Sequence, residues 1–127
     1  MTPLETTLAF ITAINAADTT ALRALMTDDH AFTDALGHSF SGAEAMLFGW
    51  QHFFHTYPGY CITIHHTFAN ADRVALFGKA EGGWCVNDSV LPQRWSVPAV
   101  WLAEIQYGKL RRWTVFCDTA WATPPKP

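Results

Sequence analysis

Hydrophobic residues in the first quarter of the chain follow a helical spacing. Leu4, Leu8, Ile11 and Ile14 recur every three or four positions, which predicts an amphipathic helix over residues 3–17 with Pro3 in its first turn. Asp18 then supplies the N-cap of a second, short helix that ends before residues 28–29. From residue 30 the period changes to two, which predicts a short β-hairpin with its turn at residues 36–37.

The remainder combines one more helix with a series of strands. A third helix is predicted from residue 41 to Tyr57, where Pro58 and Gly59 end it. Four strands follow at residues 60–69, 74–82, 94–106 and 109–118, separated by turns or loops. Successive hairpins predict an antiparallel sheet, so the fold class is α+β. The third helix has an apolar face that must be buried: Met46, Leu47, Trp50, Phe53, Phe54 and Tyr57.

Length and composition indicate a single globular domain. We expect one domain over residues 1–122 and a Pro-rich tail at 123–127. Half of the residues are hydrophobic and 15% are charged, which excludes disorder, and no apolar run approaches the roughly 18 residues of a membrane span. The N-terminus has no basic segment and no signal core, so a cytoplasmic location is expected.

Charge and cysteine usage exclude several classes of partner. The net charge is −3 and the eight Lys and Arg residues are scattered, so no nucleic acid is expected to bind. Cys61, Cys85 and Cys117 lack a CxxC spacing and are predicted to be reduced and structural. His52 and His55 have a spacing that can hold a metal, but no HExxH or carboxylate pattern accompanies them. We therefore expect no metal and no cofactor.

Aromatic residues are unusually frequent, with six Trp, nine Phe and three Tyr. Such rings either fill a core or line a ligand pocket, and the composition alone leaves both possibilities open. The strand at residues 94–106 is apolar on both faces, so helices can cover one face and a second subunit the other. We expect a homodimer through an outer sheet face that carries Val100, Leu102, Trp113 and Val115.

Two segments carry a resemblance to a known family. Residues 28–34 (Asp28-Asp29-His30-Ala31-Phe32-Thr33-Asp34), followed by Gly37 and Ser41-Gly42, resemble a pattern of ketosteroid isomerases and SnoaL-like cyclases. Residues 108–118 are similar to the last strand of SnoaL-like proteins and limonene epoxide hydrolases. The chain thus resembles the SnoaL-like branch of the nuclear transport factor 2-like superfamily. The resemblance implies a conical α+β barrel in which three N-terminal helices pack on a highly curved antiparallel sheet.

The resemblance places Asp34 where ketosteroid isomerases hold their general base. A carboxylate at the pocket mouth could take a proton from a carbon next to a carbonyl group. The alternative is that Asp34 only caps the following turn. The same alignment places the oxyanion-hole tyrosine of those isomerases at Phe10 and their protonated aspartate near Trp101. Neither residue donates as the originals do, which argues against a steroid isomerase.

Asp118 and His66 are the other catalytic candidates. Asp118 matches an acidic position of the epoxide hydrolases, but the arginine of their catalytic set has no counterpart around residues 84–87. Asp118 is in phase with Phe116, which we assign to the inner face, so it is either a pocket residue or a strand-end cap. His66 alternates in phase with Ile62 and is either a pocket residue or a satisfied core histidine.

The leading interpretation is a SnoaL-like protein whose pocket takes a small, largely apolar molecule. Its reaction would be a proton transfer of the isomerase, cyclase or lyase type, with Asp34 as base and His66 or Asp118 assisting. The alternatives are a non-catalytic small-molecule-binding module and a structural dimer with a filled pocket. The predicted ligand contacts are Phe10, Ile14, Phe32, Trp50, Phe54, Tyr57, Trp84, Trp95, Trp101 and Phe116.

Overall fold

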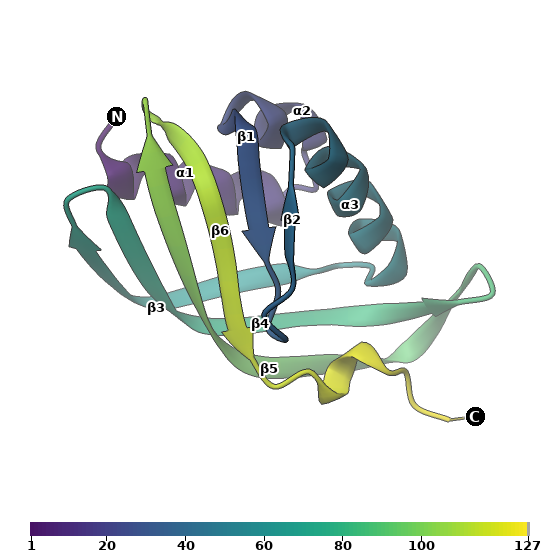
Figure 1. Ribbon diagram of the computed structural model, residues 1–127. Coiled ribbons are helices and arrows are strands. Elements are labelled where there is room, and N and C mark those ends of the chain that lie inside the picture. The colour runs from purple at the N-terminus through teal and green to yellow at the C-terminus, as the bar shows by residue number, and fades with distance from the viewer. Residues whose placement is uncertain (127) are drawn as a thin grey trace.

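Three helices lie over one side of a curved six-stranded sheet in the computed structural model, which describes residues 1–126 (Figure 1). Of the predicted tail at 123–127, Pro127 lies outside the described residues. The α+β fold class is confirmed. The elements are α1 (Pro3–Asn15), α2 (Thr19–Ala24), β1 (Met26–Thr33), β2 (Ser39–Ser41), α3 (Ala43–Thr56), β3 (Cys61–Asn70), β4 (Arg73–Val86), β5 (Ser89–Gln106), β6 (Lys109–Cys117) and the short 3₁₀ helix η1 (Ala120–Ala122).

The sheet is mixed and open. Its strand order is β2-β1-β6-β5-β4-β3, so β2 and β3 are edges and the described residues do not close a barrel. Most neighbouring strands are antiparallel as expected, but β1 runs parallel to β6. Because β6 joins β1 across most of the chain, no pattern of consecutive hairpins could predict this pairing.

Local capping fixes where the first two helices begin. Thr2 and Glu5 form a reciprocal capping box at the start of α1, with Pro3 directly after the cap. The Asp18 carboxylate accepts from the backbone N–H of Ala21 and caps α2. Helix α1 packs on β3, β4 and β6, and α3 packs on β1 and β4.

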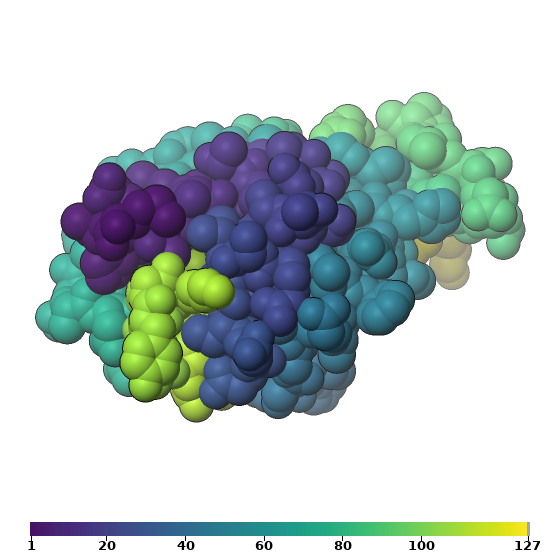
Figure 2. All heavy atoms as spheres, turned by 90° about the horizontal axis from the view of Figure 1, so that it is seen from above, coloured from purple at the N-terminus to yellow at the C-terminus, as the bar shows by residue number. Residues whose placement is uncertain are grey.

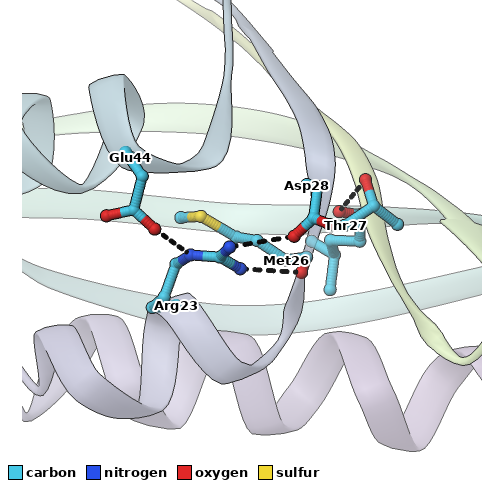
Figure 3. Close-up of polar contacts among 6 residues, drawn as sticks. Arg23, Met26, Thr27, Asp28 and Glu44 are labelled. Atoms are coloured by element: carbon cyan, nitrogen blue, oxygen red, sulfur yellow. Dashed lines mark hydrogen bonds and ion pairs between the residues drawn. The ribbon is translucent and has the colours of Figure 1, made fainter.

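Arg23 of α2 contacts both β1 and α3 (Figure 3). Its guanidinium lies between Asp28 of β1, at 2.9 Å, and Glu44 of α3, at 2.7 Å. A weaker contact of 3.4 Å joins the guanidinium to the carbonyl oxygen of Met26. Both carboxylates are exposed, so this network orients α3 against β1 more than it adds to stability.

Strands β4 and β5 extend further than their hydrophobic pattern predicts. The loop expected between residues 82 and 94 is instead strand on both sides of a two-residue turn. Asn87 and Asp88 form this turn with φ values of 52° and 61°, the left-handed conformation of a tight hairpin turn. The tip of the hairpin projects beyond α3 (Figure 2). Helices α1, α2 and α3 cover the neighbouring surface in the same view.

Candidate functional site

A cavity of about 510 Å³ lies between α3, the β1–β2 hairpin, the sheet and η1. This volume is within the range of small-molecule sites, and the wall is almost entirely apolar. It is lined by Phe32, Asp34, Ala35, Leu36, Phe40, Ala45, Met46, Gly49, Trp50, Phe53, Tyr57, Tyr60, Ala80, Trp101, Trp113, Val115, Cys117, Thr119, Trp121 and Ala122.

Small residues on α3 keep this space open. Ala45 and Gly49 face the cavity one turn apart, between the larger side chains of Met46, Trp50 and Phe53. Nothing but the Met46 methyl group, at 3.7 Å, lies within 4 Å of the position that a Cβ at residue 49 would take. The helix therefore contributes aromatic walls and a gap between them.

Asp34 lies on the cavity wall and also caps a turn. Its Oδ1 accepts from the backbone N–H groups of Leu36 and His38, both at 2.9 Å. Its Oδ2 is 3.4 Å from Nδ1 of His38, and the Asp34 side chain is 28% exposed. Among the described residues that line the cavity, Asp34 carries the one carboxylate. The turn thus holds one oxygen in place and leaves the other without a backbone partner among the described residues.

Tyr60 and Trp101 bring polar atoms to the sheet side of the cavity. The Tyr60 hydroxyl lies beside the indole of Trp101, and the thiols of Cys117 and Cys61 are nearby. Burial raises the pKa of Tyr60 well above its ordinary value, so the phenol stays protonated at physiological pH. Tyr60 is therefore a permanent hydrogen-bond donor on the cavity wall.

Trp121, in η1, lines the cavity together with Tyr60 and Trp101. Its ring stacks on Trp95 with centroids 4.1 Å apart, and its backbone carbonyl accepts from Nε1 of Trp84 at 2.8 Å. Nε1 of Trp121 is buried and has no hydrogen-bond partner within residues 1–126. Burial raises the pKa of the neighbouring Cys117 thiol, and the Trp121 N–H opposes that rise. The thiol and the indole N–H are thus neighbours on the wall.

Of the three catalytic candidates, the structure places only Asp34 on the cavity. A β-bulge between Ile64 and His66 breaks the alternation of β3 and turns His66 to the outer face, in register with Phe77. His66 is exposed, as are all residues from 65 to 70. Gly78 faces this bulge, where a Cβ would collide with the Thr63 carbonyl oxygen. Asp118 is exposed and accepts from the backbone N–H of Ala120 at 2.7 Å, so it caps the end of β6. The inward orientation expected for His66 and Asp118 is not observed.

The predicted ligand contacts divide into two groups. Phe32, Trp50, Tyr57 and Trp101 line the cavity. The other six do not line it. Phe10 and Ile14 are fully buried in the core beneath α1, and Phe54 packs against Trp50 without reaching the cavity. The indole N–H groups of Trp84 and Trp95 donate to backbone carbonyls, and Phe116 is 53% exposed on the outer face.

The inner face of β6 is the opposite of the one expected. Trp113, Val115 and Cys117 line the cavity, whereas Phe116 points away from it. The apolar residues Trp113, Val115 and Cys117 share one face, whereas Arg112 and Thr114 share the other with Phe116, so alternation in this strand indicates the observed inner face. The expected outer-face residues Trp113 and Val115 are therefore corrected to cavity residues.

Other lining residues were not predicted as ligand contacts. Met46 and Phe53 share the apolar face of α3 with Trp50, so the helical spacing could have identified them. Tyr60, the first residue after the Pro58-Gly59 stop, and Trp121, in the C-terminal segment, carry no local signal of this kind. Their position depends on the tertiary fold.

Metal and membrane features can be stated for residues 1–126. Within that range no group of three His, Cys, Asp or Glu side chains converges as a metal site would require. His55 lies 3.5 Å from Asp88, while His52 contacts Thr56 on its own helix. None of the described helices is long and apolar enough to cross a membrane.

Comparisons with solved structures place this fold among known proteins. A candidate SnoaL-like polyketide cyclase from Jannaschia sp. CCS1 has a TM-score of 0.81 at 20% identity, over 97% of this chain and 93% of that one. A nuclear transport factor 2-like protein of unknown function from Cytophaga hutchinsonii has a TM-score of 0.71 at 18% identity, over 94% and 92%. A protein with a ketosteroid isomerase-like fold from Catenulispora acidiphila, in complex with trimethylamine, has a TM-score of 0.73 at 20% identity, over 91% and 86%.

At these identities the likeness shows the fold, and the reaction is a separate question. None of the curated protein sequences is significantly similar to the chain. The profile of the SnoaL-like domain matches residues 7–113, which include most of α1, all of α2 and α3, and most of the sheet. The chain belongs to the SnoaL-like domain family.

Proposed function

We propose that the cavity binds a small, largely apolar molecule with a carbonyl group, and that Asp34 removes a proton from the carbon next to it. The observation that carries this proposal is that Asp34 is the single carboxylate that the described residues place on a largely apolar wall. Two backbone N–H groups hold Asp34 Oδ1 at 2.9 Å, so Oδ2, whose neighbour is Nδ1 of the exposed His38 at 3.4 Å, is the oxygen that would approach a ligand. A positioned carboxylate is a common general base for such a step.

The proton transfer to Asp34 needs no cofactor. The proton passes from carbon to Asp34 Oδ2, and the electron pair of the C–H bond moves into the carbonyl group to give an enolate. Reprotonation elsewhere would make the reaction an isomerisation, and attack of the enolate carbon on a second carbonyl would make it a cyclisation. The similarity to candidate polyketide cyclases supports a polycyclic or polyketide-like substrate class.

Proton exchange in deuterated water tests the base directly. A panel of aryl ketones and 1,3-diketones is incubated with the protein, and loss of the acidic C–H signal is followed by NMR. Asp34→Asn preserves the turn, because an amide oxygen also accepts from backbone N–H groups, and should lower exchange about 10²- to 10⁴-fold with little change in affinity. Asp118→Asn is the matched control, because Asp118 caps Ala120 without lining the cavity.

Equal exchange in wild type and Asp34→Asn, or none across the panel, would contradict the catalytic role and favour a non-catalytic binding module. The binding-module alternative is supported by the almost uniformly apolar wall and by Phe10, which is buried away from the cavity. A structural dimer with a filled pocket receives less support, because about 510 Å³ of the interior is open.

We also infer a homodimer, through a corrected set of outer-face residues. His66, Phe77, Val100 and Phe116 pair in one row across β3, β4, β5 and β6. Phe77 is 41% exposed and Phe116 53%, and Phe68, at 63%, packs its ring edge-to-face on Phe77. Exposed aromatic and aliphatic side chains grouped on one face of a sheet are typical of an association surface.

Sedimentation velocity at micromolar concentration should give a dimer of about 28 kDa, twice the 14.2 kDa chain. Phe77→Lys should shift it to the monomer, because a charge in the centre of an apolar interface is desolvated without a partner. Phe48→Lys, on the exposed side of α3 at 73% exposure, is the control and should remain dimeric. A wild-type monomer would refute the dimer.

A further inference from the structure

Part of the cavity wall is shut off from solvent. Trp101 of β5 and Trp113 of β6 are each 1% exposed, and Ala80 of β4 is 4% exposed. Met46 and Trp50 of α3 are buried as well. These five residues form the closed part of the cavity, which we call the floor.

The exposed lining residues come from the β1–β2 hairpin, α3 and η1. Leu36 is 68% exposed and Phe40 is 51% exposed, and Ala45, Gly49 and Ala122 are also exposed. Strand β2 lies beside α3 (Figure 1). The cavity therefore opens to solvent along these five residues, which we call the rim.

Asp34 lies next to the rim and not at the floor. It is two residues before Leu36, whose backbone N–H donates to its Oδ1 at 2.9 Å, and its side chain is 28% exposed. The turn is closed by a second contact, in which the backbone N–H of Asp34 donates to the carbonyl oxygen of His38 at 2.9 Å. A carbon that gives its proton to Asp34 must therefore lie near the entrance of the cavity.

Floor and rim favour different parts of a ligand. The floor consists of tryptophan rings and aliphatic side chains, so it favours an apolar ring system. A polar chain placed at the floor would lose its hydrogen bonds to water without replacing them. The same chain at the rim would stay in solvent and keep those hydrogen bonds.

We propose that the ligand inserts a ring system toward the floor and holds its carbonyl group and acidic carbon at the rim, so that any chain beyond the acidic carbon leaves the cavity there. This inference rests on the proposed function and adds a substrate class to it. The class is aryl ketones and 1,3-dicarbonyl compounds with a long polar chain on the acyl side. The floor limits the size of the ring system, whereas the rim leaves the chain unrestricted.

Two isomeric probes test this orientation. Each is 2-acetylnaphthalene with the same neutral tri(ethylene glycol) chain, attached to the acetyl methyl carbon in the acyl-tailed probe and to the far end of the naphthalene in the ring-tailed probe. Affinities for the full-length protein are measured by isothermal titration calorimetry, with 2-acetylnaphthalene as reference. The acyl-tailed probe should bind within about threefold of the reference, and the ring-tailed probe at least about tenfold more weakly.

A charged chain shows where the chain leaves the cavity. Leu36→Glu places a carboxylate on the rim, at a position exposed enough to accept it. When the acyl-tailed probe ends in a primary ammonium group, Leu36→Glu should raise its affinity relative to the neutral acyl-tailed probe about two- to threefold at low salt. Leu36→Lys should lower this affinity ratio by a similar factor. Val90→Glu is the matched control and should keep the wild-type ratio, because Val90 is 66% exposed and is not among the described residues that line the cavity.

Equal affinities of the two isomers, or a preference for the ring-tailed probe, would overturn the proposed orientation. An unchanged affinity ratio in both Leu36 variants would contradict the exit of the chain at the rim. The role of Asp34 would stand in either case, because it is read from proton exchange of ketones without a chain. If 2-acetylnaphthalene itself showed no saturable binding, the orientation and the ligand-binding cavity would both be wrong.

Discussion

Helices α1 and α3 both pack on the sheet, but the space beneath α1 is filled and the space beneath α3 contains a cavity. Beneath α1, Phe10 and Ile14 are completely buried and the space is filled. Beneath α3, Trp50 is buried as well, yet a cavity of about 510 Å³ remains beside it. Both helices present an apolar face to the sheet, so hydrophobicity alone does not distinguish them.

The difference lies in the sizes of neighbouring side chains. On α1, the positions next to Phe10 carry β-branched residues such as Ile11 and Thr6, which fill the space between helix and sheet. On α3, Ala45 and Gly49 lie one turn apart among larger side chains such as Trp50. The larger side chains leave the space next to these two small residues unfilled. The first arrangement contributes stability, whereas the second leaves volume for a ligand.

Truncating one phenylalanine in each half should show the largest contrast. Phe10→Ala removes a fully buried ring that packs against Trp113 and His30, and should cost about 3–5 kcal/mol in the free energy of unfolding. Phe40→Ala removes a ring that is 51% exposed at the cavity, and should cost less than about 1 kcal/mol. Urea unfolding of both variants measures the contrast.

Ligand affinity should fall more in Phe40→Ala than in Phe10→Ala, the reverse of the order expected for stability. Phe40→Ala should weaken binding of an apolar probe such as 2-acetylnaphthalene, because Phe40 lines the cavity. A Phe40→Ala variant as unstable as Phe10→Ala would mean that the α3 half is packed as tightly as the α1 half, and the comparison would fail.

Much of the fold could be predicted because it depends on local signals. Helical spacing around Phe10 and Trp50, the Asp18 cap and the Pro58-Gly59 stop act over a few residues, and they located the helices within two or three positions. The parallel pairing of β1 with β6 joins distant segments and has no local signal. The turn at Asn87 and Asp88 does have a local signal, because both residue types tolerate the left-handed conformation, and the loop was expected to pass through them. The extension of β4 and β5 up to this turn was not predicted.

The site could be predicted only in part, because inward orientation depends on strand parity. Asp34 follows directly from the segment that resembles the family, and it does line the cavity. His66 was assigned by alternation from Ile62, and a bulge opposite Gly78 reversed that assignment. Trp121 reaches the cavity through a turn after the last strand, which no periodic pattern describes.

The free energy of unfolding should depend on pH through His30, which packs against Phe10 in the filled region beneath α1. His30 is fully buried there, and its Nδ1–H donates to the Leu110 carbonyl at 2.8 Å. Burial lowers its pKa below the ordinary 6.5, Arg112 and Arg23 act in the same direction, and Asp29 and the Leu110 contact oppose them. Protonation would place a buried N–H on Nε2, which has no partner within residues 1–126.

The folded state therefore binds fewer protons at His30 than the unfolded state does. Its contribution to stability is fully present above about pH 6.5 and is lost as the pH falls toward the lowered pKa of the folded state. Urea unfolding at pH 7.5, 6.5 and 5.5 should show a steeper loss for wild type than for His30→Gln. His52→Gln, on the exposed side of α3, should keep the wild-type slope. Equal slopes for wild type and His30→Gln would refute this role.

The smallest expected effect concerns the gap on α3 itself. Glycine inside a helix is less stable than alanine by about 1 kcal/mol, and a Cβ at residue 49 would make only an ordinary contact of 3.7 Å with Met46. Gly49→Ala should therefore raise the melting temperature by about 2–4 °C while placing a methyl group in the cavity and weakening binding of 2-acetylnaphthalene. Ala45→Gly, on the same wall, should lower the melting temperature.

A Gly49→Ala protein that melts higher and binds as well as wild type would show that the ligand does not use this part of the cavity. One that melts lower would show that α3 packs more closely at residue 49 than an open cavity allows.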